Sequence, residues 1–404
     1  MLTLADIQAA RSRTQAHIPA SACRPARMRH GSGRVLLKLE NLHHTGSFKE
    51  RGALNRLLQL TPEERAKGVI TASAGNHAQG LAFHAERLDI ATTVVMPTQT
   101  PLIKVSRTEE HGATIVLHGR DYDSAHAHAR ELAKRQDSCF VHGYDDLAVM
   151  AGQGVIGLEL AEQCPDLSTV VVPVGGGGLL AGIVVALRAL RPEVRVIGVE
   201  SAQLNSMAQA LQRGGPWKLP HANTLADGIA VRQAGKLCHQ LCIEHNAELC
   251  AVDDDAIARA TLHLLEVEKV VAEGAGATAL AALQTGLIPE SDGDTALIVS
   301  GGNIDVTLLS RIINRGLVQS GRLCRVCLNV VDRPGALAGP LALLGELRAN
   351  VLEVQHQRAF SPTPMGTVEV RIVLETRGAR HIDELLTVLS EGGYPAKLES
   401  PPES

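Results

Sequence analysis

Residues 45–53 are Thr-Gly-Ser-Phe-Lys-Glu-Arg-Gly-Ala, and the lysine in this stretch, the lysine loop, is Lys49. A lysine acts as a nucleophile only when its amine is uncharged, and desolvation lowers the pKa of the amine enough to permit a Schiff base. Small residues before Lys49 leave room for a flat ring, and Phe48 could cover one face of that ring. Taken alone, Lys49 could equally be a solvated surface lysine, so its meaning depends on the rest of the chain.

The composition is that of an ordinary globular protein whose partners are small molecules or other subunits. The chain has 404 residues, 45% hydrophobic and 20% charged, which is enough for two or three domains. A net charge of −4 and an aromatic content of 2% provide neither the basic field nor the stacking platforms that nucleic acid requires. The start of the chain lacks the pattern of a secretory signal, and no apolar run could span a membrane. We therefore expect a cytoplasmic protein without a nucleic-acid or membrane partner.

The eight cysteines are scattered along the chain, unlike the framework of a small disulfide-rich protein. Cys324 and Cys327 form a C-x-x-C pattern inside an apolar run that we expect to be a strand. The odd spacing would place their side chains on opposite faces of that strand. We therefore expect buried structural thiols and no zinc site.

Short apolar strands alternate with helices from residue 35 to about residue 310. We expect helices at 52–60 and 77–87, and strands at 35–39, 68–72, 91–96, 113–117, 169–174, 194–199 and 296–299. Strands that are apolar throughout and separated by helices predict parallel sheets covered on both faces. The expected fold class is therefore α/β, doubly wound.

The pattern changes near residue 320. We expect a strand at 323–331, a helix at 336–348, strands at 351–359 and 367–374, a helix at 381–390 and a last strand at 396–398. The order βαββαβ is that of a ferredoxin-like α+β module. We place the domain boundary between residues 320 and 321.

A second segment, residues 73–80, is Ser-Ala-Gly-Asn-His-Ala-Gln-Gly, and we call it the helix-opening loop. It follows an expected strand and begins an expected helix, where free N–H groups favour a carboxylate or a phosphate. Asn76 could also donate to a phenolate oxygen. Alone, this segment would be an ordinary helix cap.

Two more loops follow expected strands. Residues 174–182, the glycine loop, are Val-Gly-Gly-Gly-Gly-Leu-Leu-Ala-Gly. Four consecutive glycines are costly to order, and a backbone whose successive N–H groups wrap a phosphate would explain that cost. The loop lacks both the dinucleotide-binding spacing and the lysine of a P-loop. Residues 299–303, the serine turn, are Val-Ser-Gly-Gly-Asn and lie where ligands of α/β sheets bind, although the composition alone indicates only a turn.

Together, in this order, the four segments resemble the pyridoxal-phosphate enzymes of fold type II, and most closely the threonine dehydratases (threonine ammonia-lyases). The resemblance covers roughly residues 10 to 315, and the module after it resembles an ACT domain. It implies pyridoxal 5′-phosphate as cofactor, with two doubly wound subdomains in a catalytic region at 1–320. The smaller subdomain would span about residues 45–145, and a regulatory ACT domain would occupy 321–404.

The resemblance also assigns roles to residues. Lys49 would hold the cofactor covalently and then take the α-proton of the substrate. Phe48 would pack on the cofactor ring, Asn76 would bind the ring hydroxyl and Ser300 would meet the pyridine nitrogen. The phosphate would lie on the backbone amides of Gly175, Gly176, Gly177, Gly178 and Leu179. The substrate would lie against Ser73, Ala74, Gly75, Asn76, His77 and Gly228.

The reaction implied is loss of water and then ammonia from L-threonine, giving 2-oxobutanoate, and from L-serine, giving pyruvate. This would serve isoleucine biosynthesis or threonine catabolism. Serine racemases of this fold carry an acid–base serine where this chain has Ala74, which disfavours racemisation. They also carry a divalent-metal site whose first acid matches Glu200 but whose second falls on Ser206, so we expect no metal.

Alternatives remain open: β-replacement, serine racemisation, or a non-catalytic amino-acid sensor, against which the retained Lys49 argues. The ACT-like module could bind an amino-acid or nucleotide effector through the turn at 332–337 and the strand at 350–358, or it could serve only dimerisation. The resemblance implies a homodimer or homotetramer.

Overall fold

The computed structural model describes residues 1–357, 364 and 366–399. The chain divides into two compact units, Met1–Ile304 and Asp305–Ser404. The division falls before helix α13 (Val306–Gln319), whereas the boundary predicted from sequence falls just after this helix.

The first unit contains a six-stranded sheet with the order β1-β2-β10-β7-β8-β9. All neighbours are parallel except β1 and β2, which are antiparallel. The antiparallel edge strand was not predicted, because its sequence is rich in arginine and none of its residues is buried. The strands are β1 (Cys23–His30), β2 (Gly33–Leu39), β10 (Asp294–Val299), β7 (Leu167–Pro173), β8 (Arg195–Ser201) and β9 (Glu248–Val252).

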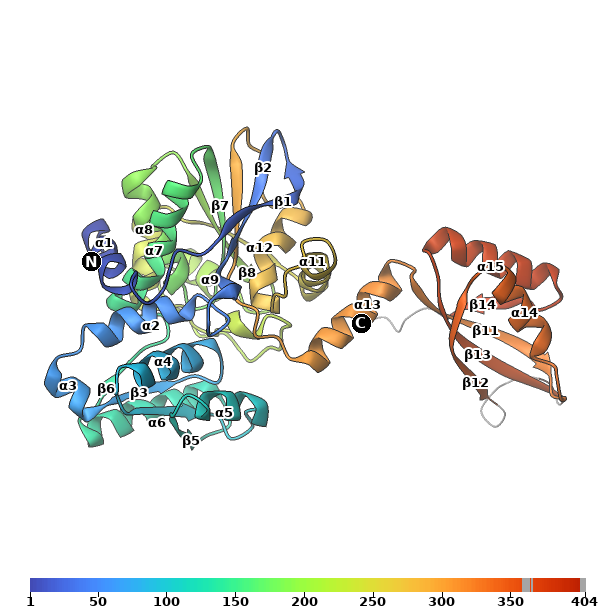
Figure 1. The fold of residues 1–404 in the computed structure, drawn as a ribbon, viewed down its shortest axis with the longest axis horizontal. Helices are drawn as coiled ribbons and strands as arrows, with labels where there is room; N and C mark the ends of the chain where they lie inside the picture. The colour runs from blue at the N-terminus through green and yellow to red at the C-terminus, as the bar shows by residue number, and fades with distance from the viewer. Residues whose placement is uncertain (358–363, 365, 400–404) are drawn as a thin grey trace. The chain divides into compact units, whose positions relative to one another are not determined.

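Helices cover both faces of this sheet (Figure 1). Val170 and Val172 of β7 belong to one core, and Val171 between them belongs to the core on the opposite face. Burial on both sides explains why the strand is apolar throughout. One face carries α1 (Leu4–Thr14), α7 (Leu147–Gln163), α8 (Gly178–Leu190) and α10 (Lys236–Glu244), and the other carries α11 (Asp254–Glu266) and α12 (Gly274–Gln284). Helix α9 (Ser206–Arg213) follows β8.

A four-stranded parallel sheet, with the order β5-β4-β3-β6, forms a smaller lobe of the same unit. Helices α2, α4 and α5 cover one face and α6 covers the other. The elements are α2 (Lys49–Leu58), α3 (Pro62–Lys67), β3 (Val69–Ala72), α4 (Asn76–Arg87), β4 (Thr92–Met96), α5 (Leu102–Glu109), β5 (Thr114–Leu117), α6 (Tyr122–Gln136) and β6 (Cys139–Phe140). The predicted α/β class is therefore confirmed, with two sheets whose strands are parallel except for the edge strand β1.

The second unit has the predicted βαββαβ order after α13. Its four antiparallel strands have the order β12-β13-β11-β14. They are β11 (Leu323–Val331), β12 (Asn350–Gln357), β13 (Thr367–Glu375) and β14 (Ala396–Leu398), with helices α14 (Ala338–Glu346) and α15 (Ala379–Glu391). Residues 358 and 359, included in the predicted strand, lie outside the described residues. Within the described residues, no helix is long and apolar enough to cross a membrane.

The core of the second unit lies between the sheet and its helices. Val326 and Leu328 of β11 and Ile372 of β13 pack with Leu385 of α15. Strand β11 alternates buried and more accessible residues, as expected for a sheet covered on one face. Cys324 is buried and Cys327 half-buried, and their spacing places them on opposite faces of this strand.

Four loops that carry the chemistry-bearing segments follow strands of the first unit. The lysine loop follows β2 through the 3-10 helix η1 (Glu40–Leu42), and the helix-opening loop follows β3. The glycine loop follows β7, and the serine turn follows β10. Ligands of open α/β sheets bind beyond the carboxyl ends of the strands, and all four loops lie at such ends.

Candidate active site

The lysine loop and the serine turn are joined through their backbones. The N–H of Phe48 donates to the carbonyl of Ser300 at 3.0 Å, and Ser47 forms a β-bridge with Gly301. Lys49 is the first residue of α2, and its Nζ donates to the carbonyl of Gly143 at 2.7 Å. The backbone before Lys49 is thereby joined to the serine turn, and the lysine amine is held by the loop before α7.

Burial lowers the pKa of Lys49 to about 8, against the opposing influence of Cys238 and Glu273. Near neutral pH about a tenth of such an amine is uncharged, far more than for an ordinary lysine. Lys49 can therefore act as a nucleophile or as a base close to pH 7.

Asn76 connects the helix-opening loop to two other segments. Its Nδ2 donates to Oε1 of Glu273 at 2.7 Å, and its Oδ1 accepts from Nδ2 of Asn303 at 2.8 Å. Asn303 also donates to the carbonyl of Thr45 at 2.7 Å, which brings the lysine loop into the same cluster. A side-chain amide has two N–H donors, so one donor of Asn76 remains for a ligand.

The start of α4 offers free space and free donors. A Cβ atom added to Gly75 would meet nothing within 4 Å. The first N–H groups of a helix lack partners within the helix and favour an anion. His77 is buried, and burial together with Lys49 lowers its pKa to about 3, so the ring is neutral. Its Nδ1 has no hydrogen-bond partner among the described residues.

The glycine loop packs so closely against its neighbours that side chains are excluded. A Cβ atom on Gly176 would lie 2.3 Å from the ring of Tyr144, and one on Gly178 would lie 2.7 Å from the Tyr144 carbonyl. Gly177 has a φ of +99°, and its Cβ would lie 2.3 Å from Met207. Glycine is therefore required at these three positions, and the loop places no side chain of its own beside the backbone amides at the start of α8, as a phosphate cradle requires.

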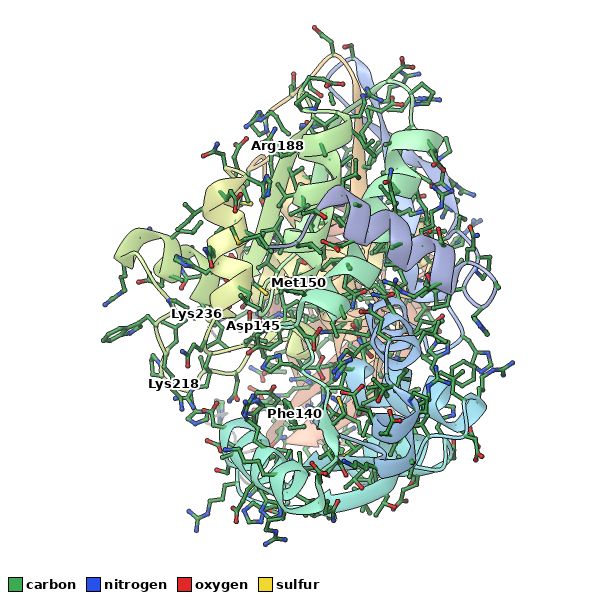
Figure 2. All side chains as sticks on the ribbon, turned by 90° about the vertical axis from the view of Figure 1, so that its left-hand side faces the viewer. Phe140, Asp145, Met150, Arg188, Lys218 and Lys236 are labelled. Carbon is green, nitrogen blue, oxygen red and sulfur yellow. The ribbon has the colours of Figure 1, made fainter. Side chains whose placement is uncertain are left out.

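Asp145 fixes the position of Tyr144 beside the glycine loop. Its carboxylate accepts from the N–H groups of Lys236 at 3.0 Å and Leu237 at 2.9 Å, at the start of α10. Figure 2 shows Asp145 beside Lys236 in this arrangement. The N–H groups of Tyr144 and Asp145 both donate to Nδ1 of His142. The loop between β6 and α7 is therefore anchored at both the glycine loop and Lys49.

Comparisons with known proteins agree with this geometry. Residues 15–301 match the model of the family described as pyridoxal-phosphate dependent enzyme. An L-threonine ammonia-lyase of Thermotoga maritima is 44% identical over 400 residues, covering 98% of this chain and 100% of the relative. Another, of Geobacter sulfurreducens, is 46% identical over 360 residues, covering 89% of this chain and 90% of the relative.

The chain belongs to the threonine ammonia-lyase family of pyridoxal-phosphate dependent enzymes. Among solved structures, a threonine deaminase of Solanum lycopersicum is similar with a TM-score of 0.68 and 34% identity, covering 77% of this chain and 91% of that chain. A serine racemase of Dictyostelium discoideum is similar with a TM-score of 0.69 and 32% identity, covering 76% of this chain and 99% of that chain. The fold is therefore shared by ammonia-lyases and racemases.

The cofactor of this family fits the residues present. The glycine loop has the side-chain-free backbone that a phosphate needs, and Lys49 has an amine of lowered pKa. Asn76 retains one amide donor for a ring hydroxyl, and Ser300 is buried where the serine turn meets Phe48. These residues of the chain would hold pyridoxal phosphate, the cofactor of the family.

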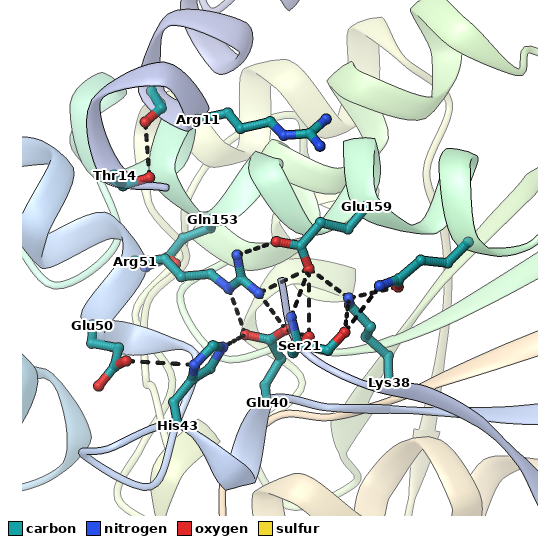
Figure 3. Close-up of polar contacts among 12 residues, drawn as sticks. Arg11, Thr14, Ser21, Lys38, Glu40, His43, Glu50, Arg51, Gln153 and Glu159 are labelled. Atoms are coloured by element: carbon teal, nitrogen blue, oxygen red, sulfur yellow. Dashed lines mark hydrogen bonds and ion pairs between the residues drawn. The ribbon is translucent and has the colours of Figure 1, made fainter. Parts of the chain in front are cut away.

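A buried network of ion pairs, drawn in Figure 3, connects the lysine loop to neighbouring elements. Arg51 pairs through Nε with Glu40 at 2.7 Å and through Nη1 with Glu159 at 2.6 Å, and Lys38 pairs with Glu159 at 2.5 Å. Burial alone would raise the pKa of Glu40, but Arg51 and His43 hold it well below its ordinary value. The network thus fixes α2 two residues after Lys49.

The other end of the lysine loop is fixed by Glu50. Its Oε2 accepts from the N–H of Thr45 at 3.0 Å and from the hydroxyl of Thr45 at 2.8 Å. His43 lies between Glu50 and Glu40, with its ring nitrogens 3.5 Å and 3.0 Å from the two carboxylates. Both ends of the loop are therefore held by buried charges that the loop sequence alone does not explain.

Gly228 lies at the edge of the same cluster. A Cβ atom there would be 3.1 Å from Oε1 of Glu273, the atom that accepts from Asn76. Its neighbour Asp227 pairs with Lys104 of α5, 2.5 Å away, across the two lobes. The predicted substrate residue is thus brought close to the helix-opening loop.

Glu200, which matches the first acid of the metal site in serine racemases, accepts hydrogen bonds from the backbone in this structure. Its two carboxylate oxygens accept from the N–H groups of Met207 at 2.7 Å and Ala208 at 2.8 Å, at the start of α9. Burial raises the pKa of Glu200 to about 7. Among the described residues, no group of three or more potential metal ligands occurs.

The sequence reasoning missed Glu273, Gly143 and Tyr144. Glu273 precedes the small residues that begin α12, and burial raises its pKa to about 7. A lone acid before such a helix would have been a usable signal. Gly143 and Tyr144 carry no such signal, because Gly143 contacts Lys49 through its backbone carbonyl and Tyr144 packs its ring against Gly176.

Proposed function

We propose that this chain deaminates L-threonine to 2-oxobutanoate and ammonia, and L-serine to pyruvate, with pyridoxal phosphate bound at Lys49. The observation that carries the proposal is the buried Lys49 amine, which donates to the carbonyl of Gly143 and belongs to the residue after Phe48, where the lysine loop meets the serine turn. Burial lowers the pKa of this amine to about 8. The 44% identity with the threonine ammonia-lyase of Thermotoga maritima over nearly the whole chain supports the choice of substrate.

Each group of the site has a task in this reaction. Pyridoxal phosphate supplies an electron sink that makes the α-proton acidic and the β-hydroxyl a leaving group. Lys49 takes the α-proton, for which its pKa is close to the working pH. The free N–H groups at the start of α4 hold the substrate carboxylate. The backbone amides from Gly175 to Leu179 hold the cofactor phosphate.

Ala74 favours elimination over racemisation. A methyl group cannot deliver a proton, so proton transfer is confined to the side on which Lys49 lies. Ala74 is half-buried and packs against the core of the smaller lobe, which fixes its position. Since racemases share this fold, the assay must measure both products: we expect 2-oxo acid from L-threonine and from L-serine, and no D-serine. D-Serine formed as fast as pyruvate would overturn the assignment.

We also infer that the second unit is an ACT-like regulatory domain of a cytoplasmic homodimer or homotetramer. Its βαββαβ order and its edge strand β12 support this inference. The turn at 332–337 and residues 350–357 of the predicted binding strand would receive an amino-acid or nucleotide effector, whereas Arg358 lies outside the described residues.

Removal of residues 321–404 tests this inference. We expect turnover of threonine to persist in the shortened chain, and any response to isoleucine, valine or AMP to be lost. A shortened chain that folds, binds the cofactor and still responds to the same effector would refute the inference. The association state, measured by sedimentation for both chains, tests the role of the domain in assembly.

A further inference from the structure

The thiols of Cys23 and Cys164 lie in contact with each other. Neither residue belongs to the candidate active site. Sγ of Cys23 and Sγ of Cys164 are 3.4 Å apart, although the residues are 141 positions apart in the chain. Cys23 begins β1 and is half-buried, whereas Cys164 follows the last residue of α7 and is buried. All eight cysteines are free thiols.

The segments that carry the two thiols are fixed by Lys38. Lys38 is the cross-strand neighbour of Cys23 between β2 and β1. Its Nζ donates to the carbonyl of Ser21 and to Oε1 of Gln163, each at 2.9 Å, and Nε2 of Gln163 donates to the same carbonyl at 3.1 Å. The residues flanking both cysteines are thus tied to one buried ammonium group, which keeps the thiols together.

The contact with Cys164 and the surrounding groups together lower the pKa of Cys23 from its ordinary value. The hydrogen bond with Cys164 lowers the pKa of Cys23, burial opposes this, and the positive charge of Lys38 lowers it further. Asp294 acts against ionisation and Arg34 favours it. Cys23 is also the more accessible thiol of the two, so it is the one an oxidant would reach.

We infer that Cys23 and Cys164 form a thiol-oxidation site that hydrogen peroxide converts to a disulfide. The Cys23 thiolate attacks one oxygen of hydrogen peroxide, the O–O bond breaks, and Cys23 becomes a sulfenic acid as hydroxide leaves. The hydroxide takes up the proton that the thiol lost on ionisation and becomes water. The Cys164 thiol then attacks the Cys23 sulfur, the S–O bond breaks, and a second water leaves as the S–S bond forms. Two thiols are oxidised by two electrons in all, and one peroxide is reduced to two waters.

The disulfide would be separate from the catalytic groups. It would join the start of β1 to the end of α7, beside Lys38 rather than at the lysine loop. A bond between residues so distant in sequence restricts the unfolded chain, so we expect the oxidised protein to unfold at a higher temperature.

Mass spectrometry of the holoenzyme tests the inference. The protein is treated with equimolar hydrogen peroxide, its remaining thiols are alkylated, and it is digested without reductant. We expect a cross-linked peptide pair containing Cys23 and Cys164, an intact mass lower by about 2 Da before alkylation, and reversal by dithiothreitol. Unreacted thiols, a sulfinic acid on Cys23 without a cross-link, or another cysteine oxidised first would each overturn the inference.

Variants separate the two steps. In Cys164→Ser, Cys23 should stop at the sulfenic acid, which dimedone traps; in Cys23→Ser, the buried Cys164 should not react. Cys250→Ser is the matched control, because Cys250 is also half-buried but burial raises its pKa to about 11. That control should form the cross-link at the wild-type rate, and its failure to do so would contradict the assignment of the pair.

Discussion

Asn76 donates its side-chain amide to Oε1 of Glu273 at 2.7 Å, joining the start of α4 to the start of α12. The contact places a buried carboxyl group beside the residue that the resemblance assigns to the cofactor ring. Burial raises the pKa of this carboxyl to about 7, and Asp227 acts in the same direction. The site therefore contains a buried carboxyl group whose pKa lies near neutral pH.

Glu273 should make the stability of the protein depend on pH. Its folded pKa of about 7 exceeds the ordinary value of 4.5, so its contribution is fully present below about pH 4.5 and is lost as pH rises through 7. Relative to Glu273→Gln, the wild-type free energy of unfolding should fall by about 1.4 kcal/mol per pH unit between these values and then level off. Urea unfolding between about pH 5 and pH 8 measures this difference. Parallel curves for the two proteins would show that Glu273 does not titrate as described.

The glycine loop should not tolerate a methyl group at Gly176. A Cβ atom there would lie 2.3 Å from the ring of Tyr144, so Gly176→Ala must displace the ring or the loop. We expect a loss of about 1–3 kcal/mol of stability and weaker retention of pyridoxal phosphate on dialysis. Gly215→Ala is the control, since a Cβ atom there meets nothing within 4 Å, and it should change stability by less than about 0.5 kcal/mol. Equal effects of the two substitutions would refute the close-contact explanation.

Arg51 should be essential to the buried network. Arg51→Met leaves Glu40 and Glu159 without their shared cation and should cost about 3–5 kcal/mol, because a buried charge loses its partner. Arg195→Met breaks a pair with Glu248 in which both side chains are exposed, and it should cost less than about 1 kcal/mol. Thermal unfolding of the two variants measures the contrast. If Arg51→Met unfolds at the wild-type temperature and binds the cofactor normally, the network does not hold the lysine loop.

Much of the fold could be predicted from local sequence. Most parallel strands of the two sheets and the βαββαβ order of the second unit follow from apolar runs and helical spacing, which are local signals. Strands β6 and β9 were not predicted, because β6 has only two residues and β9 has one buried residue. Strand β1 could not be predicted this way, because its arginine-rich sequence is paired only along one edge. The division before α13 also depends on contacts between elements and has no counterpart in the spacing of residues.

The candidate site shows the same limit. The lysine loop, the helix-opening loop, the glycine loop and the serine turn could be found because each has an unusual local sequence. Glu273 stands alone before the small residues of α12, which is a weak local signal, but its contact with Asn76 depends on how α12 lies against α4. Gly143 contributes a backbone carbonyl that any residue possesses. The support from Arg51 and Glu159 joins positions 108 residues apart, which no local pattern reveals.

The central claim is that Lys49 binds the cofactor and moves the α-proton. It is tested most directly by measuring 2-oxobutanoate formed from L-threonine by the wild-type protein and by Lys49→Ala, together with absorbance near ~410 nm, where the covalently bound cofactor absorbs. We predict turnover and a yellow colour for the wild-type protein, and neither for a folded Lys49→Ala protein. Turnover of threonine by Lys49→Ala, or a wild-type protein that stays colourless and inactive after reconstitution with pyridoxal phosphate, would contradict the account.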